Sequence, residues 1–160
     1  MIGLPLTILL TLSISLFFFY QRKRFNFIEN SIIYMVMTIF ITNVITILSL
    51  NFKVITLTEN PFLFLAVILY RDGMIPLLVL IFINVIYTNF TLKLKLFTSI
   101  LIFACLNGIQ VLLIFWEVIQ YPKWNFFYAA IVNTGYLLIG LGIASIVLFL
   151  KGVQSNDRRL

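Results

Sequence analysis

Five long apolar runs constrain the fold of this 160-residue chain more than any other feature. They lie near residues 2–20, 31–52, 61–89, 96–118 and 127–150. A run of about 20 apolar residues lets a helix cross the hydrocarbon core of a bilayer, which is about 30 Å thick. Inside lipid, helices satisfy their own backbone hydrogen bonds. We therefore predict an all-α, polytopic transmembrane helical bundle of about five spans, forming one membrane domain over residues 1–160 with a tail at 151–160.

The composition leaves no room for a separate soluble domain. Hydrophobic residues make up 62% of the chain and charged residues only 10%, whereas a soluble globular protein has about 25% charged residues. The mean hydropathy is +1.14. The segments between the apolar runs are too short to fold by themselves, so the lipid bilayer is the first partner that we expect.

The basic residues predict the orientation, because cytoplasmic loops carry an excess of Lys and Arg. No basic residue precedes the first apolar run, and Arg22 follows it closely. This order differs from that of a signal peptide and places the N-terminus outside. Five alternating spans then leave only Lys53 and Lys123 in external loops. The predicted cytoplasmic segments hold Arg22, Lys23, Arg24, Lys93, Lys95, Lys151, Arg158 and Arg159. We predict a multi-pass cell-membrane protein with a cytoplasmic C-terminus.

The net charge of +6 has the same explanation. The basic residues form small clusters beside apolar runs, where they contact lipid headgroups and set the insertion topology. A nucleic-acid-binding face would need them on one soluble surface. We therefore expect no nucleic-acid partner.

The third apolar run contains the ionisable residues Arg71 and Asp72. Ionisable residues inside a membrane span are costly and indicate a candidate functional site. Pro76 cannot donate a hydrogen bond to the carbonyl of Asp72, four residues earlier, and Gly73 adds backbone freedom. We predict that the third span is broken or kinked near 71–76, as in the discontinuous helices that form transporter sites.

A structural interpretation of the same pair stands beside the functional one, and it is the one that we favour. As a single helix, residues 61–89 would be about 43 Å long, more than the core requires. About 20 residues counted back from Phe90 end near Arg71. The pair would then lie at the outer interface, as an ion pair or an anchor.

Four amide side chains fall in the outer half or the middle of their predicted spans. They are Asn43, Asn107, Gln110 and Asn133. Arg71 and Asp72 lie at a similar depth, so inward-facing side chains would form one polar cluster that is open to the outside. Because buried amides need partners, the alternative is a packed polar network that binds no ligand.

Small and hydroxyl residues indicate helix association. Gly140 and Ala144 form a small-xxx-small pair that lets two helices approach closely. The pair serves either packing inside the bundle or association with another copy or a larger membrane protein. Hydroxyl residues form a stripe along the second run: Thr38, Thr42, Thr46 and Ser49. Such a stripe either forms hydrogen bonds between helices or lines a polar path.

The chain lacks the usual groups for catalysis. It has no histidine and a single cysteine, Cys105, and it contains no metalloprotease, hydrolase, phosphate-loop or CxxC motif. We expect no enzyme activity, no metal and no cofactor. The leading hypothesis is a non-enzymatic accessory or interaction subunit. The alternative is a component of a solute or ion carrier or channel, with a polar site around Arg71 and Asp72.

Several features together resemble a group of small, uncharacterised multi-span membrane proteins of low-GC Gram-positive bacteria. The features are Arg22-Lys23-Arg24 with Glu29-Asn30, Arg71 followed by Pro76 and Phe82-Ile83-Asn84, and Tyr121, Trp124-Asn125-Phe126 and Tyr128. The resemblance implies a bacterial plasma-membrane location and no particular activity.

Overall fold

The computed structural model of the chain describes residues 3–120, 122 and 125–157, and only the backbone of 153–157. Within these residues the fold is almost entirely helical, and five helices are long and apolar enough to cross a membrane. The spans are Gly3–Tyr20, Phe27–Asn51, Pro61–Tyr87, Leu92–Phe115 and Phe126–Gly152. The predicted helical fold is thus confirmed, and so are five helices that are long and apolar enough to cross a membrane. Tyr121, Trp124, Arg158 and Arg159 lie outside the described residues.

The spans divide into helical elements as follows. They are α1 (Gly3–Tyr20), α2 (Phe27–Thr46) with the π-helical segment η1 (Ile47–Asn51), α3 (Pro61–Ile68) with the π-helical segment η2 (Leu69–Met74) and α4 (Ile75–Tyr87), α5 (Leu92–Phe115) and α6 (Phe126–Asp157). Two short strands, β1 (Thr56–Leu57) and β2 (Ile119–Gln120), lie in the connections.

Capping side chains explain why two helices start earlier than their apolar runs. Asn26 accepts a hydrogen bond from the Glu29 amide, and its own amide donates to the Glu29 carboxylate, each at 2.8 Å. This reciprocal capping box satisfies two free amides, so α2 begins four residues before the predicted span. Thr91 caps α5 through the amide of Leu94, which brings Lys93 and Lys95 into the first turn of that helix.

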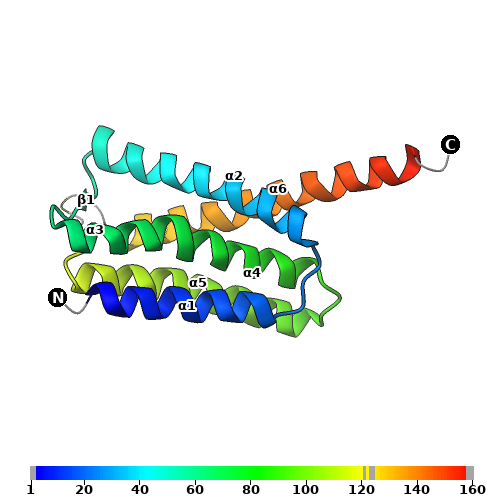
Figure 1. The fold of residues 1–160 in the computed structure, drawn as a ribbon, viewed down its shortest axis with the longest axis horizontal. Helices are drawn as coiled ribbons and strands as arrows, with labels where there is room; N and C mark the ends of the chain where they lie inside the picture. The colour runs from blue at the N-terminus through cyan, green and yellow to red at the C-terminus, as the bar shows by residue number, and fades with distance from the viewer. Residues whose placement is uncertain (1–2, 121, 123–124, 158–160) are drawn as a thin grey trace.

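The third span is the centre of the bundle. α3, η2 and α4 run in line through the molecule, and α1, α2, α5 and α6 all pack against this span (Figure 1). In an apolar stretch of 18 residues from each span, 67% of the residues are buried in the third span, compared with 11% in the first and 33% in the fourth. The apolar core is therefore organised around one helix, while the other four spans expose large apolar faces, as lipid-facing helices do.

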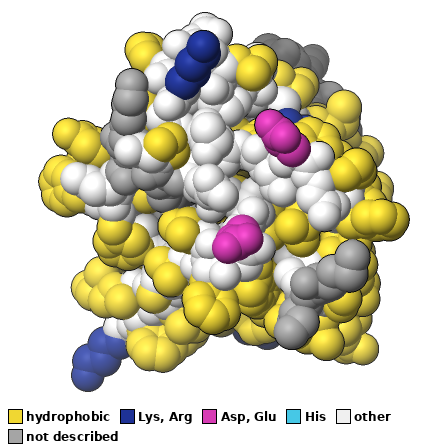
Figure 2. Space-filling view, turned by 90° about the vertical axis from the view of Figure 1, so that its left-hand side faces the viewer, with side chains coloured by type: hydrophobic (Ala, Val, Ile, Leu, Met, Phe, Trp, Pro, Cys, Tyr) yellow, Lys and Arg dark blue, Asp and Glu magenta, His cyan; other side chains and the backbone are white. Residues whose placement is uncertain are grey.

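The two ends of the bundle collect different connections. At one end β1 pairs with β2 in antiparallel fashion, so the loops after the second and fourth spans meet there. The N-terminal end of α1 lies at the same end, with Gly3 close to Trp116 and Val118. Figure 2 views this end and shows acidic side chains exposed on it. The other end of the bundle holds the loops after the first and third spans and the end of α6 (Figure 1).

The predicted break near 71–76 is not supported. The chain stays helical from Pro61 to Tyr87, although it widens to a π-helical turn over Leu69–Met74. The amide of Ile75 donates to the carbonyl of Tyr70, five residues earlier, which is the π-helical pattern. The wider turn accommodates Gly73 and Pro76 within a continuous helix.

Candidate functional site

Arg71 and Asp72 form a bidentate ion pair on the π-helical turn. The Arg71 Nε donates to Asp72 Oδ1 at 2.7 Å, and Nη2 donates to Oδ2 at 2.8 Å. The hydroxyl of Thr42, on α2, also donates to Asp72 Oδ1, at 2.9 Å. The Arg71 and Asp72 side chains are 19% and 30% exposed. Each charge is neutralised by its neighbour, which lowers the cost of placing both within a membrane span.

The backbone beneath this pair is held by two other helices. The Tyr34 hydroxyl, on α2, donates to the carbonyl of Asp72 at 2.6 Å. Pro76 has no amide proton to offer that carbonyl, so Tyr34 supplies a donor from outside the helix. On α1, the methyl group of Thr11 lies 3.4 Å from the position that a Cβ on Gly73 would occupy. A Cβ on Gly73 would therefore reach about van der Waals contact with α1.

The pair lies deep within its span. Arg71 follows Pro61 by ten residues and precedes Tyr87 by sixteen, which are axial distances of about 15 Å and 24 Å at 1.5 Å per residue. Thr42, its partner on α2, is nine residues from Asn51, where that span ends. Half of a hydrocarbon core is about 15 Å. These distances are comparable to that half-thickness, so the ion pair lies well inside both helices and not at their ends, and α3 continues directly into η2 and α4.

A second polar group joins α5 and α6. Asn133 Nδ2 donates to Asn107 Oδ1 at 3.2 Å and to Gln110 Oε1 at 3.1 Å. The three side chains are at most 8% exposed. Asn107 also donates to the Phe103 carbonyl of its own helix. These contacts hold α5 against α6, as the packed-network interpretation of the amides predicts.

A small cavity reaches this amide cluster. Its volume is about 30 Å³, and its lining includes Gln110, Asn133 and Tyr136, so it has room for about one water molecule. Tyr70, the neighbour of Arg71 on η2, lines the cavity as well. The π-helical turn thus lies between the ion pair and the amide cluster.

The single cluster expected from the sequence does not form. Asn107, Gln110 and Asn133 come together, and Arg71 and Asp72 form a separate group. Asn43 joins neither, because it is exposed and donates to the Ile39 carbonyl of its own helix. The position of a residue along its span does not determine the direction in which its side chain points. Asn43 follows Thr42 by one residue, which is about 100° around the helix, so it does not face Asp72 as Thr42 does.

Two further asparagines make a polar contact that the sequence interpretation missed. Asn84, fully buried on α4, donates to Asn30 Oδ1 at 2.8 Å. Its own Oδ1 accepts the backbone amides of Arg24 at 3.0 Å and Phe25 at 3.3 Å. Asn84 therefore fixes the basic loop after the first span to the central helix. A lone amide within the apolar residues 77–87 was the available signal.

Tyr34 was missed for a different reason. It precedes Thr38 and Thr42 at intervals of four residues, so all three lie on one face of α2. The Thr38 hydroxyl donates to the Tyr34 carbonyl of its own helix. The hydroxyls of Tyr34 and Thr42 instead donate to Asp72 on η2. Extending the hydroxyl stripe by one turn would have indicated Tyr34.

The small residues of α6, Gly140 and Ala144, pack against another helix of the same chain. Gly140 is buried and Ala144 is fully buried. A Cβ at Gly140 would lie 2.5 Å from Val79 Cγ1 and 3.2 Å from Ile83 Cδ1. The close approach therefore serves packing of α6 against α4, the first of the two uses expected for this pair.

The described basic residues that were predicted to face the cytoplasm lie at one end of the bundle. Lys151, near the end of the fifth span in α6, forms a salt bridge of 2.8 Å with Glu29, in the first turn of α2. Lys93 and Lys95 lie in the first turn of α5, and the basic loop Arg22–Arg24 adjoins α2. The described cytoplasmic candidates therefore share one end.

Neither a metal site nor a relative identifies the activity. In the described part of the chain, no three histidine, cysteine or acidic side chains gather as a metal site requires. Comparisons with protein-family models, curated proteins and solved structures give no match. The resemblance to small bacterial membrane proteins therefore stays a prediction, and any function has to be argued from the residues themselves.

Proposed function

We propose that the chain is a multi-pass protein of the cell membrane with its N-terminus outside and its C-terminus in the cytoplasm. The support is the charge distribution between the two ends of the bundle. The end that carries Lys93, Lys95 and Lys151 also carries the basic loop after the first span. The opposite end carries Lys53 together with the exposed Glu59 and Glu117. An excess of basic residues favours the cytoplasmic side.

We further propose that the chain is a non-enzymatic accessory or interaction subunit. The observation that carries this proposal is that the polar side chains between the helices bind one another. Asp72 is satisfied by Arg71 and Thr42, and Asn133 by its two amide partners. The cavity at the amide cluster, about 30 Å³, holds roughly one water. Closed networks of this kind specify a fixed packing of helices and offer little room for a travelling solute.

The outer helices provide the surface on which such a subunit would act. Only 11% of the first span is buried, and Leu9, Leu12 and Leu16 of α1 are each more than half exposed. In a membrane this apolar face contacts either acyl chains or another helix. Binding of a second helix by α1 would leave the polar networks intact.

Photo-crosslinking in the intact membrane tests this proposal. A photoreactive phenylalanine analogue replaces Leu12 on α1 or Phe149 on α6, which are 59% and 71% exposed. The expected result is one discrete adduct, of fixed mass, from at least one of these positions. The matched control replaces Phe82, which is only 7% exposed, and gives no adduct to another chain. Lipid adducts alone from every exposed position would contradict the proposal.

A carrier or channel component is the second candidate, and the Arg71–Asp72 pair favours it. The pair is partly exposed, lies about 15 Å from the end of its span, and sits on a π-helical turn. Such turns occur frequently at functional sites. If this candidate holds, Asp72→Asn should abolish solute movement in proteoliposomes while the amount of folded protein is unchanged. Unaltered movement would exclude a role of the pair in transport.

A further inference from the structure

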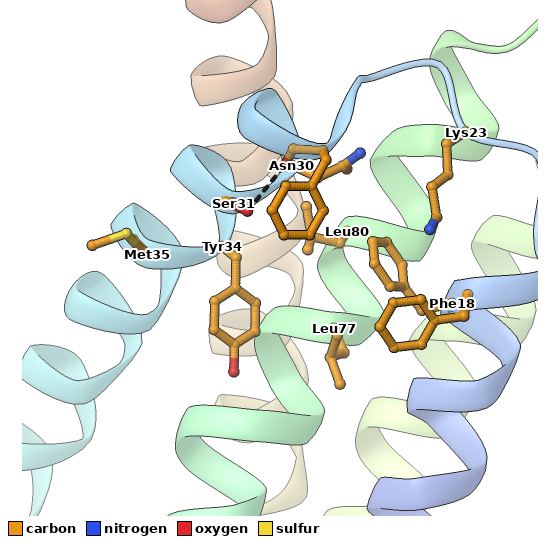
Figure 3. A pocket seen from close by; sticks show the side chains of 10 residues that line it. Phe18, Lys23, Asn30, Ser31, Tyr34, Met35, Leu77 and Leu80 are labelled. Atoms are coloured by element: carbon orange, nitrogen blue, oxygen red, sulfur yellow. Dashed lines mark hydrogen bonds between the residues drawn. The ribbon is translucent and has the colours of Figure 1, made fainter.

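A groove opens between α1 and α2, and residues of the central helix α4 line it between them. It has a volume of about 400 Å³. Phe18 of α1 forms one wall, Leu77 and Leu80 of α4 lie between the two helices, and Tyr34 of α2 lies at the far end (Figure 3). Phe19 of α1 also lines the groove. The groove is therefore apolar along most of its length and lies within the membrane-spanning part of the fold.

The side chain of Lys23 lies at the other end of this groove. The amine of Lys23 lies 4.5 Å from the centroid of the Phe18 ring and 5.0 Å from that of Phe19. Figure 3 shows the Lys23 side chain directed along the groove toward Phe18. A lysine at a membrane boundary usually extends its amine to the polar headgroups, whereas this amine is held at the mouth of an apolar groove.

The nearby carboxylates are engaged elsewhere. Glu29 forms its salt bridge with Lys151 and completes the capping box with Asn26. Asp72 is paired with Arg71. The positive charge of Lys23 is therefore available to an anion at this end of the groove.

The groove follows the direction of a lipid chain and covers most of the depth of one leaflet. On α2 its lining runs from Phe27 to Met35, which is about 12 Å along the helix axis. It extends from the basic loop toward mid-membrane, parallel to the acyl chains of one leaflet. An ion alone would leave the apolar part empty, and a polar peptide would lose its hydration there.

We propose that this groove binds an anionic phospholipid of the cytoplasmic leaflet. The phosphate lies beside Lys23, and one acyl chain lies along Phe18, Leu77 and Leu80 toward Tyr34. Basic pockets between transmembrane helices on the cytoplasmic side are suited to such headgroups. This lipid site goes beyond the proposed accessory function, and only its assignment to the cytoplasmic leaflet rests on the proposed orientation.

Native mass spectrometry of the delipidated full chain tests the proposal. The protein in mild detergent is titrated with phosphatidylglycerol or with phosphatidylcholine of identical acyl chains. We expect tighter binding of phosphatidylglycerol, and a loss of about fivefold in that preference for Lys23→Gln, the effect of one basic residue near an anionic headgroup. Lys23→Arg should keep the preference.

Two further variants separate this site from nonspecific charge and from free anions. Lys93→Gln removes the same charge from an exposed position on α5 and should leave the preference unchanged. Ser31→Trp fills the groove between α1 and α2, and should weaken binding of both lipids. Equal losses for Lys23→Gln and Lys93→Gln would overturn the proposal. So would displacement of the bound lipid by glycerol phosphate, which would leave only an anion site.

Discussion

The hydroxyl of Tyr34 donates a hydrogen bond of 2.6 Å to the backbone carbonyl of Asp72. This carbonyl lies four residues before Pro76, whose nitrogen carries no proton. A side chain on α2 thus satisfies a backbone group that the central helix cannot satisfy at that position in the α-helical pattern. The contact gives the Asp72 carbonyl a donor beside Pro76, and it connects α2 to the π-helical turn.

We expect Tyr34→Phe to lower the free energy of unfolding by about 1 kcal/mol, because it removes this hydrogen bond and leaves the ring in place. Thermal unfolding in detergent measures the effect. Tyr20→Phe is the matched control, since Tyr20 is 88% exposed, and it should change nothing. Equal stability of both variants would show that the Asp72 carbonyl has an adequate partner without Tyr34.

The ion pair allows a double-mutant cycle. Arg71→Gln or Asp72→Asn alone should each cost about 1–3 kcal/mol, because each leaves a charged partner without its hydrogen bonds. The double variant should cost less than the sum of the two, since no unpaired charge remains. Strict additivity would mean that the two side chains do not interact within the membrane.

The two glycines of α6 make a matched pair. Gly140→Ala should destabilise the fold by about 1–3 kcal/mol, because its Cβ collides with Val79 and Ile83. Gly142 is exposed, with nothing within 4 Å of an added Cβ. Gly142→Ala should therefore be neutral or stabilising by up to about 1 kcal/mol, through helix propensity. If both variants had the same stability, α6 would not pack closely on α4.

The orientation is open to cysteine labelling. In a Cys105→Ser background, Glu59→Cys and Asn89→Cys each place one exposed thiol in a loop at opposite ends of the bundle. A membrane-impermeant maleimide should label Glu59→Cys in intact cells and Asn89→Cys only after permeabilisation. The reverse pattern would place the N-terminus in the cytoplasm.

Apolar run length was enough to predict the five spans, because a helix is the form in which such a run can satisfy its backbone in lipid. Predicting where each helix begins would also have required the capping side chains. Asn26 caps α2, which begins at Phe27, and Thr91 caps α5, which begins at Leu92. Span length and hydropathy do not report such side-chain contacts.

The candidate site was predicted less completely. Arg71 and Asp72 stood out because charges are rare in an apolar run, and the amides of α5 and α6 because buried amides need partners. Which amides meet depends on the rotation of each helix, and this is why Asn43 was grouped with residues that it does not contact. The Asn30–Asn84 bond joins residues 54 positions apart. Local sequence patterns carry no information about that pairing.

The mass of the intact particle, purified from its own membrane in a mild detergent, tests the proposed interaction role most directly. After bound detergent and lipid are removed in the gas phase, we expect a mass that exceeds the 18.6 kDa of one chain by at least one whole further chain. That chain is either a second copy or a different protein in fixed ratio. A particle of a single 18.6 kDa chain would contradict the account, and solute movement by that single chain would favour the carrier instead.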